Sequence, residues 1–421
     1  MVTQFAGMKS RRILDVALEH MLDDPVVILE GPRSVGKSTL LSEIARKRGG
    51  RVIDLDDPAT LTAMLADPAT QIAGDQLVCI DEYQKAPLVL DAIKAELNRG
   101  TTPGRFVLTG SASHESLPGA AQALTGRLDR LEVLPLSQGE IDGVYEDWLE
   151  RFLSDPHACV SPELSSTTRE DYINRIVAGG FPLALAASSD AARNRWLKNY
   201  VSLTLARDVV ELSAIRHGAL LPDLLARLAA QTAHVLNVEK AAKDIGLEKN
   251  TAARYVSLLE QVFLLYRLPA WGRTLSARTA RLPKVHMMDS AVAAQQMRLT
   301  ATKLARRDAP ALTEFGHLLE TFVVGELKKQ ASWLPDAHSL GHWRTRDDNE
   351  VDFVLERDDG CVVAIEIKAG TRVAGQELRS ISHLRDKLGE AFLGGAVLYL
   401  GQRSYNFDDR IFVIPVDRLW T

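Results

Sequence analysis

Apolar and polar positions change their spacing several times along the chain. Over the first 137 residues, short apolar runs alternate with helix-patterned segments, which predicts a parallel α/β sheet. Five of these runs have strand character: PVVILEG, RVIDLD, QLVCIDE, RFVLTGSAS and RLEVLPLS. An acidic, irregular stretch then reaches about Arg169, and residues 170–232 carry Leu, Ala and Val at helical spacing. Residues 233–271 read as short helix, turn, longer helix and strand, and α/β character returns from Thr313. The pattern therefore predicts several domains.

Composition narrows the class of protein. The 421 residues are 46% hydrophobic and 25% charged, as in globular proteins. No apolar run approaches the roughly 18 residues of a membrane span, and the N-terminus lacks the apolar core of a secretory signal. Three widely spaced cysteines, Cys79, Cys159 and Cys361, argue against a disulfide framework or a zinc cluster. We therefore expect a cytoplasmic protein with no membrane partner.

Charge is unevenly distributed around a formal net charge of −5. Residues 262–307 hold nine Lys or Arg and a single acid, whereas residues 132–171 hold ten acids and two bases. Such asymmetry fits one surface that can approach phosphate and another that cannot. Ordinary surface patchiness is the alternative, and the sequence leaves it open.

A phosphate-binding loop is the most specific motif. Residues 31–38 read GPRSVGKS, a complete G-x-x-x-x-G-K-[ST] match between an apolar strand and a helix. The glycines allow backbone N–H groups to surround phosphate, and the helix N-terminus adds positive potential. Lys37 would reach the β and γ phosphates of ATP, and Ser38 would hold Mg²⁺. The predicted nucleotide-binding residues of this segment are Gly31, Pro32, Arg33, Ser34, Val35, Gly36, Lys37, Ser38 and Thr39.

Polar residues at the ends of two later strands complete the expected site. QLVCIDE places Asp81 and Glu82 at a strand end, where Asp81 would bind the Mg²⁺ shell and Glu82 would deprotonate the attacking water. The strand RFVLTGS ends in Thr109 and Ser111, which would sense the γ-phosphate. Two adjacent acids also occur in plain solvated loops, but beside a phosphate loop they favour catalysis.

This order of elements resembles the AAA-type ATPases, in which an arginine before the fifth strand often stabilises transition-state charge. Arg127 occupies the matching place, with Arg130 as a substitute, and a plain surface arginine is the alternative. The stretch AGGFPLAL resembles the Gly-x-Pro turn in the lid of signal-transducing relatives, which implies that Pro182 contacts the base. The same stretch also reads as a helix-breaking turn, and the role of Arg207 stays open.

The middle segment has the pattern of a helix-turn-helix with a trailing, wing-like strand. Lys249, Asn250 and Arg254 would face a DNA groove, although many such domains contact protein instead. A basic stretch follows, with two aromatic residues among its charges, which suits phosphate contacts and occasional stacking. Its members are Arg267, Arg273, Arg278, Arg281 and Lys284, with Tyr266 and Trp271.

A hairpin near the C-terminus carries acids and a base within its strands. EVDFVL and VVAIEI flank the turn ERDDG, so Asp352 lies on one strand while Glu366 and Lys368 share a face of the other. Converging carboxylates suit Mg²⁺ or Mn²⁺, and the amine would activate water. Glu320, on the preceding helix, is a further candidate ligand, and Arg344 and Arg346 stand close by for phosphate. The alternative to a metal site is an amphipathic hairpin with an ordinary Glu–Lys pair on its solvent-facing side.

The motif Asp, spacer, Glu-x-Lys resembles the PD-(D/E)xK nuclease superfamily, although Val351 replaces its usual proline. Nearly the whole chain is similar to a prokaryotic family of AAA-type ATPases with a C-terminal domain of uncharacterised function. The resemblance implies an α/β multidomain fold: an AAA-type ATPase core at 1–140, an insert and helical lid at 141–215, a winged helix-turn-helix at 216–285, a basic linker at 286–312 and a nuclease-like domain at 313–421.

Two functions remain open at this stage. The first is an ATP-hydrolysing protein whose nucleotide state controls DNA binding and metal-dependent DNA cleavage. The second is a nucleotide-dependent switch that binds a protein partner, with an inactive nuclease-like domain as scaffold. A nuclease needs an accessible metal site beside a basic channel, and a switch needs neither. The sequence does not give the oligomeric state, nor whether Arg127 acts in its own subunit or in a neighbour.

Overall fold

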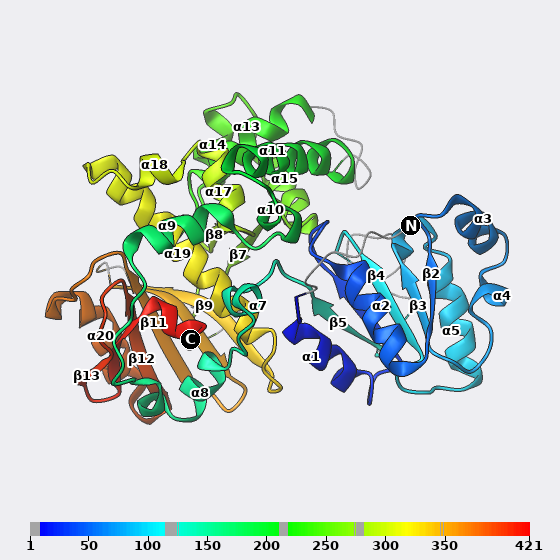
Figure 1. Cartoon of the computed structure of the whole chain (residues 1–421), viewed down its shortest axis with the longest axis horizontal. Coiled ribbons are helices and arrows are strands. Elements are labelled where there is room, and N and C mark those ends of the chain that lie inside the picture. The colour runs from blue at the N-terminus through cyan, green and yellow to red at the C-terminus, as the bar shows by residue number, and fades with distance from the viewer. Residues whose placement is uncertain are drawn as a thin grey trace.

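The computed structural model describes residues 9–113, 124, 126–209, 218–272, 274, 282–345, 347 and 349–421. One β-sheet lies at each end of the molecule, and the mostly helical middle of the chain joins them (Figure 1). Among the described residues, no helix combines the length and apolar character needed to cross a bilayer.

The N-terminal unit is a five-stranded parallel sheet of order β2-β3-β4-β1-β5. Alternate residues of the interior strand β1 (Val26–Glu30) enter two cores, because Val27 and Leu29 pack with α1 and α2 while Val26 and Ile28 pack with α5. This two-sided burial explains the continuous apolar runs. All five predicted strands are present, although β5 ends at Glu132. The elements are α1 (Arg12–His20), β1 (Val26–Glu30), α2 (Lys37–Arg48), β2 (Arg51–Asp54), α3 (Pro58–Ala66), α4 (Pro68–Ile72), β3 (Val78–Asp81), α5 (Val89–Arg99), β4 (Phe106–Gly110) and β5 (Leu128–Glu132).

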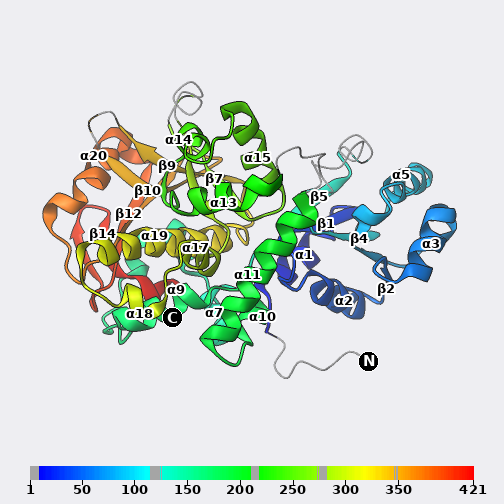
Figure 2. The ribbon, with the colours of Figure 1, turned by 90° about the horizontal axis from the view of Figure 1, so that it is seen from above.

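Helices follow the first sheet, as their spacing predicts. The long helix α11 runs alongside the N-terminal unit in the view from above (Figure 2). Its apolar face buries Leu197, Tyr200, Val201 and Leu205. The helices are α7 (Gln138–Asp142), α8 (Trp148–Ser154), α9 (Arg169–Ala178), α10 (Pro182–Leu185) and α11 (Asp190–Ala206).

The middle segment contains the predicted helix, turn, helix and strand, preceded by α13 and closed by β8. Its small antiparallel sheet has the order β6-β8-β7. Residues 286–312, expected to be a linker, are instead folded: they hold the end of β8, the buried helix α17, and α18. The elements are α13 (Leu221–Ala229), β6 (His234–Val235), α14 (Val238–Lys243), α15 (Lys249–Gln261), β7 (Leu265–Leu268), β8 (Lys284–Met287), α17 (Ser290–Gln296) and α18 (Ala301–Leu304).

The C-terminal unit is a six-stranded mixed sheet of order β13-β14-β12-β11-β10-β9. The predicted hairpin is present, since β10 pairs antiparallel with β11 and Phe353 lies opposite Ile365. One long helix precedes the sheet, beginning at Ala309 rather than Thr313. The elements are α19 (Ala309–Ala331), β9 (His338–Arg344), β10 (Glu350–Arg357), β11 (Val362–Lys368), α20 (Arg379–Leu388), β12 (Phe392–Tyr399), β13 (Tyr405–Asp408) and β14 (Ile411–Pro415).

Buried polar contacts fasten α19 to the segment that follows β5. The Gln138 N–H donates to Glu326 Oε2 at 2.8 Å, and the Leu149 N–H donates to Gln330 Oε1 at 2.8 Å. Lys329 Nζ donates to the Leu136 carbonyl at 3.0 Å and to Glu326 Oε1 at 2.6 Å. Because a buried polar group left unpaired is costly, these bonds fix one docking position for the C-terminal unit.

Candidate nucleotide site and carboxylate cluster

The phosphate loop lies at the carboxyl end of β1, where the sequence motif places it. Gly31 has φ +155°, and a Cβ there would lie 2.3 Å from the Val133 carbonyl oxygen. The loop therefore needs glycine to pass the chain that leaves β5. Ser38 and Thr39 lie in the first turn of α2 with exposed side chains, at the helix end that favours anions.

Lys37 is buried within the loop. Its Nζ donates to the carbonyls of Gly31 and Pro32, both at 2.8 Å. Burial lowers the pKa of Lys37 to about 8, against the opposing effect of nearby Glu82. Its ammonium is therefore held in place to meet phosphate, but it titrates close to neutral pH.

The predicted acids Asp81 and Glu82 are brought together with Thr109 at neighbouring strand ends. The hydroxyl of Thr109 donates to Asp81 Oδ1 and accepts from the Glu82 N–H at 3.1 Å. Glu82 adopts the left-handed conformation, with φ 56°. Its carboxylate accepts hydrogen bonds from Gln84 and, at 3.2 Å, from Ser111. Hydroxyls at the end of β4 thus set the positions of both acids, and Glu82 is held in a backbone conformation that a non-glycine residue rarely adopts.

The helical lid reaches the phosphate loop through a charged pair. Arg33 Nε donates to both carboxylate oxygens of Asp208, each at 2.8 Å, and Asp208 is buried. Arg207, the neighbour of Asp208, caps the end of α11 with its backbone. The contact places the end of the lid directly against the loop.

Pro182 begins α10 and is half-buried behind the glycine turn. Gly179 has φ +66°, and a Cβ there would lie 2.2 Å from Asp289 Oδ1. The Gly180 N–H donates to Asp289 Oδ2 at 2.7 Å, and its carbonyl accepts from the Leu136 N–H at 2.9 Å. The turn therefore anchors the lid to the chain that leaves β5, and base contact by Pro182 stays a prediction.

Arg127 does not lie at the phosphate loop of its own chain. It precedes Leu128, which pairs with Val26 at the start of β1, whereas the loop follows Glu30 at the opposite end of that strand. At about 3.3 Å per residue, the length of the strand separates them. Its guanidinium donates to Asn98 Oδ1 at 2.7 Å. A catalytic role within the same subunit is therefore wrong, and a role in a neighbouring subunit stays a prediction.

Arg11 is a site residue that sequence reasoning missed. Its guanidinium donates to the carbonyls of Val35 at 2.7 Å and Leu134 at 2.6 Å, and to Glu140 Oε1 at 3.1 Å. It therefore braces the phosphate loop against the segment after β5. No local motif marks such a brace, because its partners lie far away in the sequence.

The predicted DNA contacts on α15 are exposed. Lys249 pairs with Glu239 at 3.0 Å, Asn250 is exposed, and the guanidinium of Arg254 lies 5.6 Å from the Tyr255 ring centre. Arg273, Arg278 and Arg281 fall outside the described residues, as does Arg346.

The two aromatic residues of the basic stretch are buried, which contradicts their predicted stacking on bases. Tyr266 stacks on His286 with ring centres 5.4 Å apart, and Trp271 Nε1 donates to Glu356 Oε2 at 2.8 Å. Each ring therefore serves the protein interior.

Lys284 also departs from its expected role as a phosphate contact. It is 1% exposed, and its Nζ lies 2.7 Å from Glu320 Oε1, 2.6 Å from Glu350 Oε1 and 2.9 Å from Asp352 Oδ1. Two of the three predicted metal ligands thus bind an ammonium group of the same chain. Burial raises the pKa of Glu320 to about 8, with the Asp352 charge adding to the rise.

Glu366, the third predicted ligand, is paired separately. Its Oε1 accepts from Lys368 Nζ at 2.6 Å, while Asp352 Oδ2 accepts from the Ile367 N–H at 3.0 Å. Burial raises the pKa of the Glu366 carboxyl. Asp352 and Glu366 are each 6% exposed, and with Lys284 bound to Glu320 and Asp352 no three of these acids lie at the spacing of a shared metal ion in the described part of the chain.

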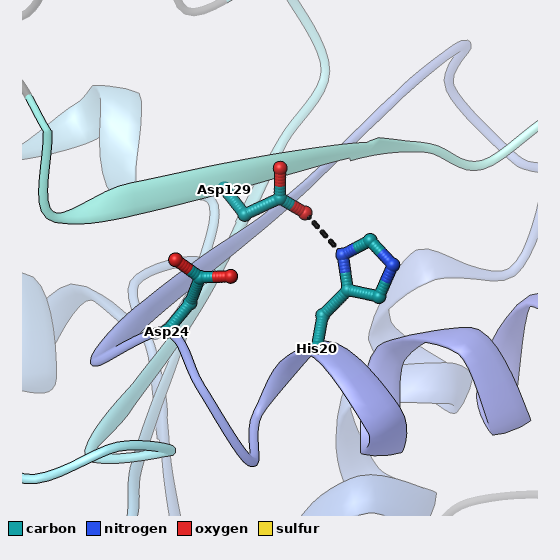
Figure 3. A group of neighbouring side chains, drawn as sticks. All are labelled: His20, Asp24 and Asp129. Carbon is teal, nitrogen blue, oxygen red and sulfur yellow. Dashed lines mark hydrogen bonds and ion pairs between the residues drawn. The ribbon is translucent and has the colours of Figure 1, made fainter. Parts of the chain in front are cut away.

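Among the described residues, a single group has metal-ligand spacing: His20, Asp24 and Asp129 (Figure 3). His20 Nδ1 lies 2.6 Å from Asp129 Oδ2, and both side chains are one-third exposed. Asp129 belongs to β5 and His20 ends α1, so the pair ties that helix to the sheet edge. We assign it this structural role.

A comparison with known protein families bears on the fold of the N-terminal unit. Residues 23–142 match the family model of an AAA domain. With its phosphate loop and parallel sheet, the N-terminal unit has an AAA-type P-loop ATPase fold. Beyond this AAA-type domain, residues 169–303 match one domain of unknown function (DUF8612) and residues 315–419 match another (DUF4143).

Whole-chain relatives and solved structures show where further likeness lies. Uncharacterized proteins of Mycobacterium bovis and Mycobacterium tuberculosis are each 26% identical over 402 residues, covering 94% of this chain and 81% of the relative. A Walker-type ATPase of Pyrococcus abyssi aligns over 69% of this chain and 96% of its own, at 14% identity and a TM-score of 0.42. AMPPCP-bound DnaA from Aquifex aeolicus aligns over 61% and 89%, at 15% identity and a TM-score of 0.26.

Proposed function

We propose that this protein is an ATP-hydrolysing switch in which the nucleotide state of the AAA-type domain controls binding by the middle segment, with DNA as the bound partner. The observation that carries the proposal is the assembly of Lys37, Asp81, Glu82 and Thr109 at one sheet edge. These side chains come from two neighbouring strand ends, those of β3 and β4, and from the start of α2, which is the arrangement that phosphoryl transfer to water needs.

The donor set of this edge suits Mg²⁺ and a nucleotide triphosphate. The Ser38 hydroxyl and the Asp81 carboxylate supply hard oxygen ligands, and Lys37 supplies the positive charge for phosphate oxygens. When bound, Mg·ATP supplies the phosphoanhydride bond that water attacks. Glu82 orients and deprotonates that water, and the Thr109 hydroxyl holds Glu82 and Asp81 in position by hydrogen bonds to both residues.

A hydrogen bond from the end of β4 to α15 supports coupling between the nucleotide site and the middle segment. The Ser113 N–H, just beyond β4, donates to the carbonyl of Gln261 at 3.0 Å. Gln261 is the last residue of α15, whose first turn presents Lys249 and Asn250. A displacement of Thr109 or Ser111 during hydrolysis would therefore act on the helix that we propose binds DNA.

The element order of the middle segment supports the same partner. Helix, strand, two helices and two further strands follow one another from α13 to β8, with β8 between β6 and β7. This is the order of a winged helix, in which α15 would be the recognition helix. Exposed Lys249, Asn250 and Arg254 on that helix suit phosphate and base-edge contacts.

Two alternatives have observations in their favour. A protein partner is favoured by the pairing of Lys249 with Glu239 and by the burial of Tyr266 and Trp271. DNA cleavage is favoured by the hairpin that carries Asp352, Glu366 and Lys368 behind α19, the order of a PD-(D/E)xK nuclease. The burial of both acids weighs against an accessible nuclease site, so we place cleavage second.

The test combines hydrolysis with binding. ATP turnover is measured for the wild type and for Lys37→Ala, and anisotropy of labelled duplex and single-stranded DNA is measured for Glu82→Gln with ATP, with ADP and without nucleotide. We expect turnover to be lost in Lys37→Ala and DNA affinity to differ between nucleotide states.

A control tests whether DNA binding depends on the basic residues of α15 or on positive charge anywhere on the surface. A Lys249→Glu, Arg254→Glu double variant should weaken DNA binding by at least about tenfold at low salt, since phosphate contacts are strongly electrostatic. The exposed Lys94→Glu change on α5 should leave affinity nearly unchanged. ATP turnover without DNA binding in any nucleotide state would support the protein-partner alternative, and absence of turnover would reject the switch.

A further inference from the structure

Lys284 connects the middle segment to the interior of the C-terminal unit. It is the first residue of β8, and its side chain reaches acceptors on α19 and β10. The ammonium has three carboxylate neighbours within 2.9 Å, from Glu320, Glu350 and Asp352. At 1% exposure it is almost completely withdrawn from water.

An isolated ammonium would be very costly to bury, so the three carboxylates must carry the balancing charge. The converse also holds, because three converging carboxylates repel one another unless a cation lies between them or a proton neutralises one of them. In this structure the chain itself provides that cation.

Most of the carboxylate oxygens already accept hydrogen bonds from protein groups, and this arrangement does not fit a divalent metal. Asp352 uses Oδ1 for Lys284 and Oδ2 for the Ile367 N–H, and Glu366 uses Oε1 for Lys368. The remaining oxygen, Glu366 Oε2, is buried and has no hydrogen-bond partner among the described residues. Mg²⁺ requires near-ideal octahedral oxygen ligands at about 2.1 Å.

We propose that Lys284 is a built-in cation that excludes divalent metal from the carboxylate cluster of the C-terminal unit. The middle segment makes this autoinhibitory contact on Glu320, Glu350 and Asp352, whereas Glu366, on the neighbouring strand, pairs with Lys368. The proposal rests on the cleavage candidate above only in treating these acids as a cation site, and it requires neither DNA cleavage nor ATP hydrolysis.

Removal of the ammonium should open the cluster. Without Lys284 the Glu320 and Asp352 carboxylates lose their shared partner, and Glu366, whose Oε2 is unpartnered among the described residues, stands opposite Asp352 in the register of β10 and β11. The favourable way to restore charge balance is then a divalent cation from solution, held by the same oxygens.

The experiment measures Mn²⁺ binding to the full-length protein by electron paramagnetic resonance, without nucleotide or DNA. The wild type should show no Mn²⁺ site that depends on Asp352. Lys284→Ala should gain one site per chain, with affinity at least about tenfold above the wild type, because a hard-cation ligand set becomes free. Lys284→Arg keeps the charge and should gain none. Lys284→Ala with Asp352→Asn should lose the gained site.

Several results would overturn the proposal. One is an Mn²⁺ site in the wild type that disappears in Asp352→Asn, which would show that Lys284 does not exclude metal. Another is a folded Lys284→Ala protein, with wild-type circular dichroism and ATP turnover, that binds no additional Mn²⁺. If Lys284→Ala fails to fold, Lys284→Met, which keeps the length of the side chain without its charge, takes its place and should gain the same Asp352-dependent Mn²⁺ site. Metal binding and ATP turnover are separate readouts, so failure of the switch would leave this test unaffected.

Discussion

Arg33 of the phosphate loop and Asp208, just after α11, form a bifurcated ion pair across 175 residues of sequence, with Nε 2.8 Å from each carboxylate oxygen. Asp208 is 5% exposed at its side chain and Arg33 is 34% exposed, so the pair is partly screened by solvent. A negative charge therefore stands beside the loop whose other charged side chain, Lys37, is to meet phosphate. Charge that is bound or removed at the loop should therefore alter this charge-assisted contact.

We predict that Asp208→Asn tightens nucleotide binding. The amide keeps the shape of Asp208 but removes a charge that repels phosphate, and it releases Arg33 to the loop. A change on the order of 1 kcal/mol, about fivefold in Kd, is reasonable at this partly exposed position. Titration calorimetry with ADP measures it. Arg33→Gln should shift the Kd in the opposite direction, and equal effects of both variants would contradict the argument.

The depressed pKa of Lys37 predicts that nucleotide affinity falls as pH rises. Burial lowers this pKa to about 8, so the ammonium that phosphate requires is mostly present at pH 7 and mostly absent at pH 9. The Kd for ADP should therefore rise by up to about tenfold between pH 7 and pH 9, with net proton uptake on binding. Calorimetry in buffers of different ionisation enthalpy measures both quantities. A flat profile over this range would reject the role of Lys37.

The lowered pKa of Lys37 also affects the stability of the folded protein, which should rise with pH, whereas nucleotide affinity should fall. Between pH 8 and the ordinary lysine pKa of 10.5, the unfolded chain holds a proton at Lys37 that the folded chain lacks. The contribution of Lys37 to the free energy of unfolding is therefore unfavourable below pH 8 and diminishes as pH rises through this window. Nucleotide, which favours the charged form, acts against this trend.

Glu82→Gln should separate binding from turnover. The amide cannot accept a proton from water, so turnover should fall by about 10² to 10⁴, while the affinity for ATP stays within about twofold. Phosphate release and nucleotide titration measure the two effects. Thr109→Val is the matched positional variant, because it removes the hydroxyl that joins Asp81 to the Glu82 N–H. It should lower turnover too, and retention of full turnover would remove Thr109 from the site.

Features that lie close together in the sequence were predictable. The phosphate loop is contiguous with its strand and helix, so Gly31 to Ser38 identify it without knowledge of the fold. Asp81 and Glu82 end an apolar strand, and parallel strands bring their carboxyl ends to one edge. The C-terminal hairpin follows in the same way from a turn between two apolar runs.

Features that depend on tertiary partners were not predictable. Lys284 stands in a basic stretch and so reads as a phosphate contact, yet its acceptors lie 36, 66 and 68 residues away. The same limit applies to Asp208 and Arg11. Tyr266 appeared exposed because it stands beside Arg267, but β7 packs on both faces, with His286 stacked against the tyrosine ring. Spacing identifies a strand, but only the fold shows what covers it.

Glu146 provides a test of how the chain after β5 is held. It lies between α7 and α8, where the Ser137 hydroxyl and, at 2.9 Å, the Gly139 N–H donate to its carboxylate. Burial nevertheless raises the pKa of Glu146 to about 8, and the charge of Glu326 on the docked α19 adds to the rise. The folded protein therefore holds a proton here that the unfolded chain loses above pH 4.5.

The contribution of Glu146 to the stability of the folded protein should fall as pH rises. Between pH 4.5 and about 8 the folded state binds more protons than the unfolded state, so the contribution of Glu146 to stability is present at low pH and is lost as pH rises through 8. Glu146→Gln removes the ionisable group and keeps one acceptor oxygen. The variant should melt at a temperature similar to the wild type at pH 4.5 and several degrees higher at pH 8.5, since the linked loss of stability in the wild type accumulates between these pH values and amounts to a few kcal/mol, at about 1.4 kcal/mol per pH unit. Scanning fluorimetry at both pH values measures the difference. If the variant were less stable than the wild type at pH 8.5, the carboxylate would have to be ionised and stabilising, and α19 would then dock against a charged rather than a neutral Glu146.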